Sequence, residues 1–504
     1  MRYRATAAVK QRQRSLLDMP AGTPAYRPSD QETLMSAPAH DPRLDSAVPP
    51  TPTSPTATDP TPPTTKPARG EHRSGRWIEH WDPEDPTFWH GGGRAIARRN
   101  LVISVLAEFL GFCVWALWSV VVPLLAAHGF ALTLDEQFWL IAVPSLVGAT
   151  LRIPYTFAVP RFGGRNWTVV SALLLLVPCT ALSVVVQHPD TSFGVLLLCA
   201  ALAGLGGGNF ASSMTNISFF YPEAEKGRAL GLNAAGGNLG TGIVQLVVPA
   251  VVTIGAGVHL ERAGLMFVPL AVLAAVLAWR GMDNLAGIRA DYGAYAAAAR
   301  APHTWIISVL YLGTFGSFIG YAGVFPTLLR TQFPGHPGWF AFLGALLGAL
   351  ARPLGGIVAD RVGGSRVTIA SFVALAVGAV LAIRGLHDHS FAAFFVAFLV
   401  LFLAAGTGNG ATYRMIPAVF RAGASDDPRR LATARKTAAG CIGIAGAVGA
   451  YGGFLVPRGF AFSQTHSGSL VPALWVFLAV YLAMATVTYA GYAAPRRSLA
   501  DESV

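Results

Sequence analysis

GATLRIPYTFAVPRFGGRNWT, at residues 148–168, recurs in altered form as GALARPLGGIVADRVGGSRVT, at residues 348–368. The shared glycines, arginines and threonine all lie at one constant offset, which indicates that the chain contains an internal duplication. Each copy also places an arginine, Arg152 or Arg352, near the middle of an apolar run. A charge is costly there and is kept mainly for function. We therefore expect the two arginines to meet between the repeats and to hold an anion.

The composition identifies a membrane protein with many spans. Of the 504 residues, 53% are hydrophobic and only 12% are charged, and the mean hydropathy is +0.48. Such a chain has too little polar surface for an ordinary soluble protein. The formal charge of +11 comes from lysines and arginines in short loops and tails. Membrane topology explains this basicity better than a nucleic-acid partner does, and we expect no nucleic acid.

The cysteines do not indicate a disulfide framework or a metal site. All four lie inside apolar runs, without C-x-x-C spacing and without a neighbouring histidine pair. We interpret them as small core residues and expect no metal and no cofactor. The four are Cys113, Cys179, Cys199 and Cys441.

Twelve apolar stretches follow, each long enough for the about 20 helical residues that cross a hydrocarbon core. The sequence therefore predicts an all-α polytopic membrane protein with twelve transmembrane helices in two six-helix repeats. The expected spans are 101–127, 137–159, 166–187, 192–220, 229–256, 262–280, 304–330, 338–360, 366–386, 390–417, 432–456 and 469–492.

The remaining segments complete the domain organisation. Residues 1–75 are rich in Pro and Thr and lack an apolar period, so we expect a disordered tail. Aromatic and charged residues mix in the segment just before the first span, which is typical of a membrane interface. The expected order is the tail 1–75, an interfacial segment 76–100, an N-terminal half 101–280, a central loop 281–303 with a short surface helix, a C-terminal half 304–492 and a tail 493–504.

Basic residues in the connections predict the orientation. If both termini are cytoplasmic, the cytoplasmic connections hold fourteen lysines and arginines and the outer connections hold four. This asymmetry follows the positive-inside rule, so we expect a protein of the cell membrane with both termini inside. The inner set is Arg161, Arg165, Lys226, Arg228, Arg280, Arg289, Arg300, Arg361, Arg366, Arg421, Arg429, Arg430, Arg435 and Lys436, and the outer set is Arg262, Arg330, Arg384 and Arg458.

Several longer motifs resemble one transporter family. They are GLGGGNFASSMTNISFFYP from Gly204, KGRALGLNAAGGNLGTG from Lys226, LRIPY around Arg152, ARPLGG around Arg352 and GTGNGATYRMIP from Gly406. Together they resemble the nitrate/nitrite porters, the NarK-type family of the major facilitator superfamily. The likeness covers the chain apart from its N-terminal tail. It implies two parallel six-helix halves with a substrate site at the membrane midplane between them.

Arg152 and Arg352 are the first candidates for substrate binding. Nitrate and nitrite are small, planar and monovalent, and a guanidinium offers a fixed fork of donors that suits planar oxyanions. Alternatively, each arginine pairs with an acid or extends to the membrane surface, but few acids are present in the spans. The resemblance implies that these two residues bind the anion, one from each half.

An aromatic pair is the second candidate group. The resemblance implies that Phe210 and Phe315 sandwich the flat substrate, which would exclude tetrahedral anions by shape. Tyr311 lies four residues before Phe315, on the same face of a helix, and can donate a hydroxyl hydrogen bond. The alternative is that these side chains only pack, as most of the 29 phenylalanines must.

Glycine-rich spans predict close contacts between helices. Glycines lack the side chains that hold helices apart, so neighbouring backbones can touch, slide or bend. The resemblance also implies that Asn238 contacts substrate, whereas Asn209 and Asn409 are expected to join helices. The glycines expected to serve packing and gating are Gly204, Gly206, Gly208, Gly236, Gly237, Gly240, Gly406, Gly408 and Gly410.

Glu108, in the first span, is the candidate for proton coupling. An acid within a span is rare and can act as a proton carrier. Equally, it can neutralise an arginine or form a hydrogen bond to a neighbouring helix. The sequence leaves these two interpretations open.

The sequence as a whole predicts a secondary transporter of nitrate and nitrite, not an enzyme. Neither a Ser/His/Asp set nor a metal cluster nor a catalytic domain is recognisable in it. Two arginines that repel each other when empty favour nitrate/nitrite exchange by alternating access. The alternatives are proton-coupled nitrate symport through Glu108 and a carrier for another small anion. The expected partners are nitrate, nitrite and the lipid bilayer, and the expected state is a monomer.

Overall fold

The computed structural model describes residues 72–73, 75–422, 424 and 427–494. All of them belong to one compact unit, residues 65–504. The predicted Pro/Thr-rich tail and the predicted C-terminal tail lie almost entirely outside the described residues.

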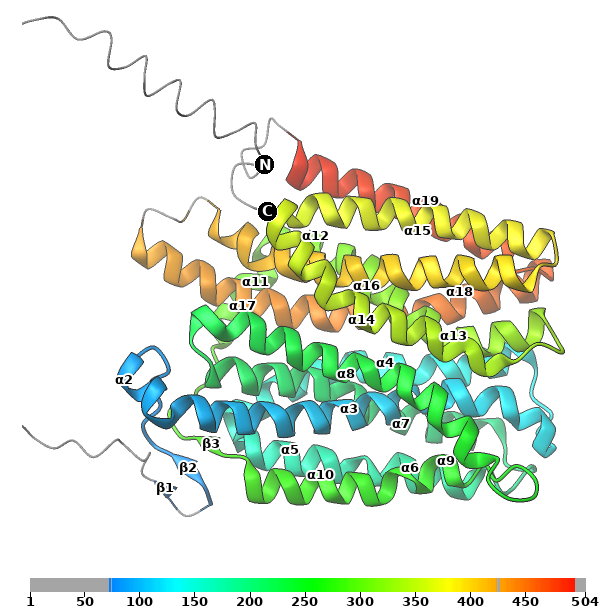
Figure 1. Ribbon diagram of the computed structural model, residues 1–504, viewed down its shortest axis with the longest axis horizontal. Helices are drawn as coiled ribbons and strands as arrows, with labels where there is room; N and C mark the ends of the chain where they lie inside the picture. Colours follow the sequence, from blue (N-terminus) through cyan, green and yellow to red (C-terminus); the bar gives the residue numbers. More distant parts are fainter. Residues whose placement is uncertain (1–71, 74, 423, 425–426, 495–504) are drawn as a thin grey trace, which may run out of the picture. The chain divides into compact units, whose positions relative to one another are not determined.

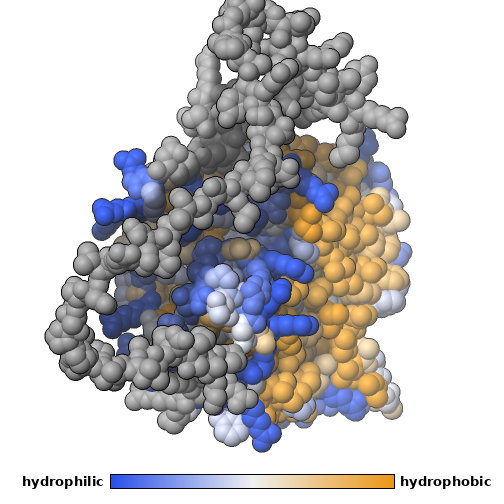
Figure 2. All heavy atoms as spheres, turned by 60° about the vertical axis from the view of Figure 1, so that its left-hand side comes forward, coloured by the Kyte–Doolittle hydropathy of each residue, from blue (hydrophilic) through white to orange (hydrophobic). Residues whose placement is uncertain are grey.

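Within the described ranges, twelve helical segments are long and apolar enough to cross a membrane, as the sequence predicts. Hydrophobic side chains cover the side of the bundle, and hydrophilic ones gather at its end (Figure 2). The first half consists of α3 (Arg94–Leu125), η2 (Ala126–His128), α4 (Leu134–Phe162), α5 (Gly164–Leu174), α6 (Leu176–Val185), α7 (Phe193–Phe220), α8 (Glu223–Val252), α9 (Arg262–Leu265) and α10 (Phe267–Gly281). The second half consists of α12 (Pro302–Tyr311), η3 (Leu312–Gly316), α13 (Ser317–Gln332), η4 (Gly338–Phe340), α14 (Ala341–Val362), α15 (Gly364–His387), α16 (Phe391–Arg421), α17 (Pro428–Ala450), α18 (Gly452–Ser467), α19 (Val471–Thr488) and η5 (Tyr489–Ala493).

The eleventh span extends further than the sequence predicts. Its helical segment runs from Pro428 to Ser467, whereas the apolar pattern ends near residue 456. The added turns carry polar side chains that look like a loop in the sequence. Two of these groups find partners within the fold, because Arg458 forms an ion pair with Asp135 and the Ser463 hydroxyl donates to the carbonyl of Ser469.

The duplication is visible in the backbone. A single glycine joins α4 to α5, and its counterpart joins α14 to α15. Gly163 has φ 87° and ψ 144°, and Gly363 has φ 96° and ψ 135°. Residues with a side chain rarely adopt a positive φ, so glycine is needed at both sharp turns. The repeated Gly-Gly pairs therefore form the same sharp turn between two helices in each half.

The two halves meet along equivalent pairs of helices. The second span, α4, packs against the eleventh, α17 and α18, and the fifth, α8, packs against the eighth, α14. In Figure 1 the helices of the second half, from α14 to α19, lie above those of the first half. We call the end where α3 begins and α19 ends the basic end, because its connections carry the fourteen lysines and arginines named above. The opposite end is called the far end.

Short elements at the basic end tie the start of the described chain to the end of the sixth span. Strand β2 (Trp77–Ile78) pairs with β1 (His72–Arg73) in antiparallel fashion and with β3 (Asn284–Leu285) in parallel. A short helix, α2 (Pro86–Phe88), and a π-helical turn, η1 (Trp89–Gly93), then lead into α3. The predicted surface helix of the central loop is also present, as α11 (Tyr292–Arg300).

A buried carboxylate holds this arrangement together. Asp283 is fully buried, and its carboxylate accepts hydrogen bonds from Arg76 at 2.8 Å, Arg99 at 2.5 Å and Asn100 at 3.0 Å. Its own amide donates to the Asn100 side chain at 2.9 Å. Because Arg76 precedes α3, Arg99 lies near the start of α3 and Asp283 follows the sixth span, this network closes the first half at the basic end.

Replacing both cations of this network should destabilise the protein. Arg76→Gln combined with Arg99→Gln leaves a buried carboxylate without a cation, at a cost of about 3 kcal/mol. The melting temperature in detergent measures this effect. A matched double variant, Arg414→Gln with Arg430→Gln, removes cations from two half-exposed carboxylates and should cost under about 1 kcal/mol. Equal losses of melting temperature in the two double variants would contradict a structural role for the buried network.

Candidate functional site

The two predicted arginines lie at equivalent positions in the two halves. Arg152 is in α4 and Arg352 is in α14, and their side chains are only 1% and 5% exposed. Both guanidinium carbons face the same aromatic rings, those of Phe210 and Phe315. The structure therefore brings the duplicated arginines together at one buried site between the halves.

Arg152 is held by main-chain carbonyls from both halves. Its Nε donates to Gly207 of α7 at 3.3 Å, and its Nη1 donates to Gly446 of α17 at 2.6 Å. Its Nη2 is buried and has no hydrogen-bond partner. The guanidinium is thus fixed in place while one nitrogen remains free to bind a ligand.

Arg352 also has a free nitrogen. Its Nη2 donates to the Tyr311 hydroxyl at 3.4 Å, and its Nη1 is buried without a partner. Among the described residues, neither Arg352 nor Arg152 forms an ion pair with a carboxylate. Two positive charges therefore lie in the interior with unused donors, which is the arrangement that an anion would complete.

Phe210 and Phe315 form a stacked pair beside the arginines. Their ring centroids are 6.2 Å apart and their planes differ by 24°. The Arg152 guanidinium carbon lies 4.4 Å from the Phe210 ring and 5.1 Å from the Phe315 ring. A planar anion between two ring faces needs about 7 Å, twice the optimal contact of about 3.5 Å. The sandwich that the resemblance implies thus requires the rings to part slightly.

The π-helical turn η3 positions the second aromatic ring. This turn contains Phe315 and directly follows α12, which ends at Tyr311. The Tyr311 and Phe315 rings stack with centroids 5.2 Å apart and planes 17° apart, so the proximity predicted from their spacing is confirmed. Such π-helical turns often occur at functional sites.

Tyr413, which the sequence analysis did not select, is also part of the site. Its ring lies 5.6 Å from the Arg352 guanidinium carbon and 5.8 Å from the Tyr311 ring. Its hydroxyl is buried without a partner. Tyr413 lies within the quoted GTGNGATYRMIP motif, but an aromatic residue in an apolar span does not reveal which face it occupies.

Glu108 is fully buried in α3 and belongs to a polar cluster beside the site. Its Oε2 accepts a hydrogen bond from the Asn233 side chain at 2.6 Å, whereas Oε1 has no partner. Asn233 also donates to the Ser213 hydroxyl at 2.6 Å, and Ser213 lies 2.9 Å from the Ser104 hydroxyl. The expected contact with a neighbouring helix is therefore present, because Asn233 belongs to α8. The unpaired oxygen also leaves a place for a proton.

Three buried asparagines lack side-chain partners. Both amide atoms of Asn238, Asn209 and Asn409 are buried without a hydrogen bond. The expectation that Asn209 and Asn409 join helices through hydrogen bonds is therefore wrong for this structure. Asn238 remains a candidate for substrate contact, since its amide could pair with a ligand.

The nine glycines singled out in the sequence lie where helices approach each other closely. A methyl group added at Gly204 would lie 2.8 Å from the backbone nitrogen of Gly148, and added at Gly208 it would lie 2.7 Å from the Tyr155 ring. Similar clashes would occur at the other seven. Larger residues would therefore push helices apart within each half: α7 from α3 and α4, α8 from α3, and α16 from α14, α15 and η3.

Several contacts hold the halves together at the far end. Arg458 of α18 forms an ion pair with Asp135 of α4 at 2.9 Å and lies 4.1 Å from the Trp139 ring. Near the middle of the bundle, Thr150 and Tyr451 join their hydroxyls at 3.0 Å. Because the arginines and phenylalanines of the site are also buried, the structure describes an occluded site.

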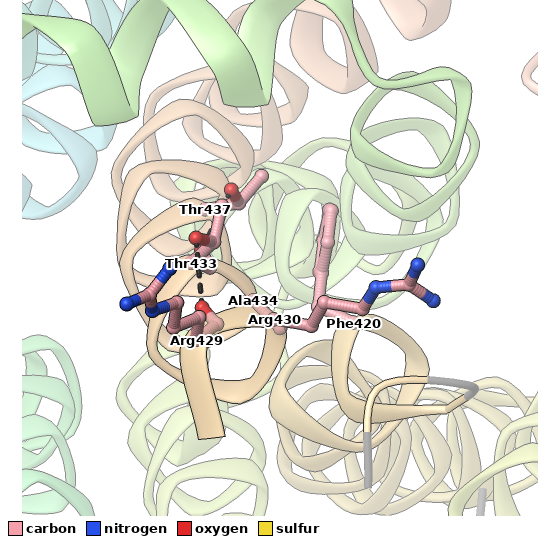
Figure 3. Close-up of a pocket in the computed structure, with 6 residues that line it drawn as sticks. All are labelled: Phe420, Arg429, Arg430, Thr433, Ala434 and Thr437. Carbon is pink, nitrogen blue, oxygen red and sulfur yellow. Dashed lines mark hydrogen bonds between the residues drawn. The ribbon is translucent and has the colours of Figure 1, made fainter. Parts of the chain in front are cut away.

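A separate surface pocket of about 380 Å³ lies at the basic end, between the end of α16 and the start of α17. Figure 3 shows its lining, in which the Thr433 hydroxyl donates to the carbonyl of Arg429. None of the residues predicted to bind substrate lines this pocket. Its lining residues are Phe420, Arg429, Arg430, Thr433, Ala434 and Thr437.

Known proteins resemble the chain over most of its length. Residues 105–334 match the family model of the Major Facilitator Superfamily. The chain is 42% identical to "Nitrate/nitrite transporter NarU" of Escherichia coli (strain K12), over 84% of this chain and 98% of that protein. It is 37% identical to "Probable nitrate/nitrite antiporter NarK2" of Thermus thermophilus, over 81% of this chain and 94% of that protein.

A solved structure supports the fold. The crystal structure of a D-xylose-proton symporter matches 78% of this chain and 97% of its own, with a TM-score of 0.59 and 15% sequence identity. The likeness of fold, together with the close relatives and the repeated arginine helices, leads to one assignment. The chain belongs to the nitrate/nitrite porter family of the major facilitator superfamily.

Proposed function

We propose that this protein carries nitrate and nitrite across the membrane by alternating access, and that Arg152 and Arg352 bind the anion. The proposal rests mainly on one observation. Two buried guanidinium groups, one from each half, each have a free nitrogen and no carboxylate partner within the described part of the chain. The names of the relatives, which are nitrate/nitrite transporters, agree with it.

The aromatic pair favours planar monovalent anions. Once parted slightly, Phe210 and Phe315 would leave a flat slot beside the arginines that a tetrahedral anion such as sulfate would not fit. Tyr311 already accepts a hydrogen bond from Arg352, so its own proton is free to be donated to the anion. Asn238, whose amide has no partner, is the proposed additional contact.

Exchange is the mode that best suits this arrangement. Without an anion, the two like charges repel each other across a buried site, which disfavours closure of the halves. A bound anion removes the repulsion and lets the occluded state form. We therefore propose that the halves pass through this state mainly when loaded, so that nitrate entry is coupled to nitrite exit. The nine glycines lie at contacts between helices of the same half, so they would let the helices within each half slide or bend as the halves rock.

Proton-coupled nitrate symport is a second candidate, favoured by the surroundings of Glu108. A fully buried carboxyl with one unpaired oxygen, which interacts electrostatically with both arginines, offers a place where a proton can bind. Its other oxygen accepts from Asn233 of α8, so protonation could alter the contact between α3 and α8.

The orientation of the carrier in the membrane is proposed from its charges, and its oligomeric state is proposed from its site. The basic end is proposed to face the cytoplasm, in the cell membrane, because cytoplasmic connections are enriched in lysine and arginine. All proposed substrate contacts come from one chain, so the protein is proposed to work as a monomer.

Conservative replacement of either site arginine should abolish transport. In proteoliposomes, Arg152→Lys and Arg352→Lys should each lower nitrate uptake by about a hundredfold, because a lysine cannot form the forked contacts of a guanidinium. The control is Arg384→Lys, an exposed arginine of α15, which should transport normally. Near-normal uptake by both site variants would contradict the two-arginine site.

Replacement of the buried acid separates the two modes. If transport is proton-coupled, Glu108→Gln should abolish nitrate uptake driven by a pH gradient but retain nitrate/nitrite exchange, since the amide keeps the shape and loses only the proton site. The exposed Glu79→Gln serves as the control. Proton-driven uptake that survives in Glu108→Gln would remove this residue from the coupling mechanism.

A further inference from the structure

We propose that Tyr413 is a specificity-determining residue of the anion site, whose hydroxyl donates a hydrogen bond to the third oxygen of nitrate and so favours nitrate over nitrite. This inference rests on the proposed transport function and names a contact that the function alone does not require. It begins from the position of Tyr413 in α16, beside the Arg352 guanidinium.

Tyr413 and Tyr311 both contact Arg352. The Tyr413 ring lies 5.6 Å from the guanidinium carbon, and the Tyr311 hydroxyl accepts a hydrogen bond from Nη2 at 3.4 Å. The two tyrosine rings are 5.8 Å apart and tilted by 45°. Tyr413 is therefore packed directly against one of the two anion-binding arginines.

The environment of the Tyr413 hydroxyl differs from that of the residue as a whole. The residue as a whole is half-buried, yet its hydroxyl oxygen is buried and has no partner. Other buried tyrosines of the second half do have partners, because the Tyr321 and Tyr481 hydroxyls bond to each other at 2.5 Å and Tyr492 bonds to His303 at 3.1 Å. A buried hydroxyl without a partner costs free energy, and a ligand that accepts its proton would remove that cost.

A count of free donors indicates which ligand atom Tyr413 would contact. Arg152 Nη2 and Arg352 Nη1 are unpaired, and each can donate to one oxygen of the anion. The hydroxyl protons of Tyr311 and Tyr413 are also free to be donated. Nitrite has two oxygens, which the arginines can satisfy alone. Nitrate has a third oxygen, for which Tyr413 offers a donor in addition to Tyr311 and Asn238, the contacts proposed above.

Removing this hydroxyl should change the preference between the two anions. For Tyr413→Phe, competition against labelled nitrate in proteoliposomes should show an about tenfold weaker affinity for nitrate and an unchanged affinity for nitrite. The control is Tyr155→Phe, which removes another buried, unpaired hydroxyl. The ring of Tyr155 packs against Trp167 and not against the arginines. This control should keep the wild-type ratio of affinities.

Two outcomes would overturn the inference about Tyr413: an unchanged ratio of affinities, or equal losses for both anions. These outcomes differ from a failure of the proposed function, in which the wild-type protein itself would not transport nitrate. The melting temperature of Tyr413→Phe shows whether the variant is folded. A folded variant that transports neither anion would also count against a role in selectivity.

A second inference rests on different residues and concerns the central loop. We infer that α11 is a latch that holds the basic end of the carrier closed. It is seated on α17, where a methyl group added at Gly440 would lie 2.8 Å from the Ala294 carbonyl and one added at Gly443 would lie 2.9 Å from the Tyr295 ring. The missing side chains of these two glycines therefore make room for α11.

An ion pair also joins α11 to α17. The Asp291 carboxylate faces Lys436 of α17 at 3.4 Å and accepts a hydrogen bond from the Ala294 amide at 2.9 Å. The hydrogen bond from Ala294 lowers the pKa of Asp291, so this carboxylate is ionised at neutral pH. The attachment of α11 to the second half thus combines close helix packing with a charge pair.

The attachment to the first half is made by aromatic rings. Phe157 of α4 lies 5.1 Å from the Tyr292 ring and 4.9 Å from the Tyr295 ring. Alternating access requires the ends of α4 and α17 to separate when the basic end opens. Because the contacts with α17 are more extensive, α11 should stay on the second half and release Phe157.

Cross-linking distinguishes the two attachments of α11. In a variant without the four native cysteines, Phe157→Cys and Tyr295→Cys joined by a short bifunctional maleimide should lower nitrate uptake by about tenfold, because the link prevents opening. The control joins Asp291→Cys to Lys436→Cys, which move together in this account, and should retain uptake. Equal uptake by the two cross-linked proteins, whether retained or lost, would overturn the latch.

Discussion

The burial of two arginines without carboxylate partners is the constraint on which the rest of the structure depends. A charge inside a membrane protein is costly unless something compensates it. Here the compensation is incomplete, since main-chain carbonyls hold Arg152 and a tyrosine hydroxyl holds Arg352, but each keeps an unpaired nitrogen. An anion supplies what is missing, and its binding therefore changes the energy of bringing the halves together.

The close packing of the helices serves this constraint. Glycines let α4 approach α7 and let α14 approach α16, so that the two arginine-bearing helices stay near the centre of the bundle. The same small residues allow a carbonyl such as that of Gly207 to reach Arg152. The duplicated turns at Gly163 and Gly363 give the two halves the same geometry, which explains why the arginines end at equivalent places.

Much of this arrangement could be predicted from the sequence, because it leaves a signal along the chain. Apolar runs of sufficient length predict the spans, and the constant offset between the repeats predicts the paired arginines. The position of Tyr413 beside Arg352 leaves no such signal, since it depends on the rotation of α16. Two hydrogen bonds likewise depend on packing between distant segments: the one from Arg152 to the Gly446 carbonyl and the one from Asn233 to Glu108. Polar residues of α18 suggested a loop because their partners, such as Asp135, are far away in the sequence.

The most direct test of the central claim is an experimental structure of the protein determined with nitrate. The account predicts density for one planar anion beside Phe210 and Phe315, within hydrogen-bond distance of both Arg152 and Arg352. An empty site under saturating nitrate, or an anion bound by only one of the two arginines, would contradict it.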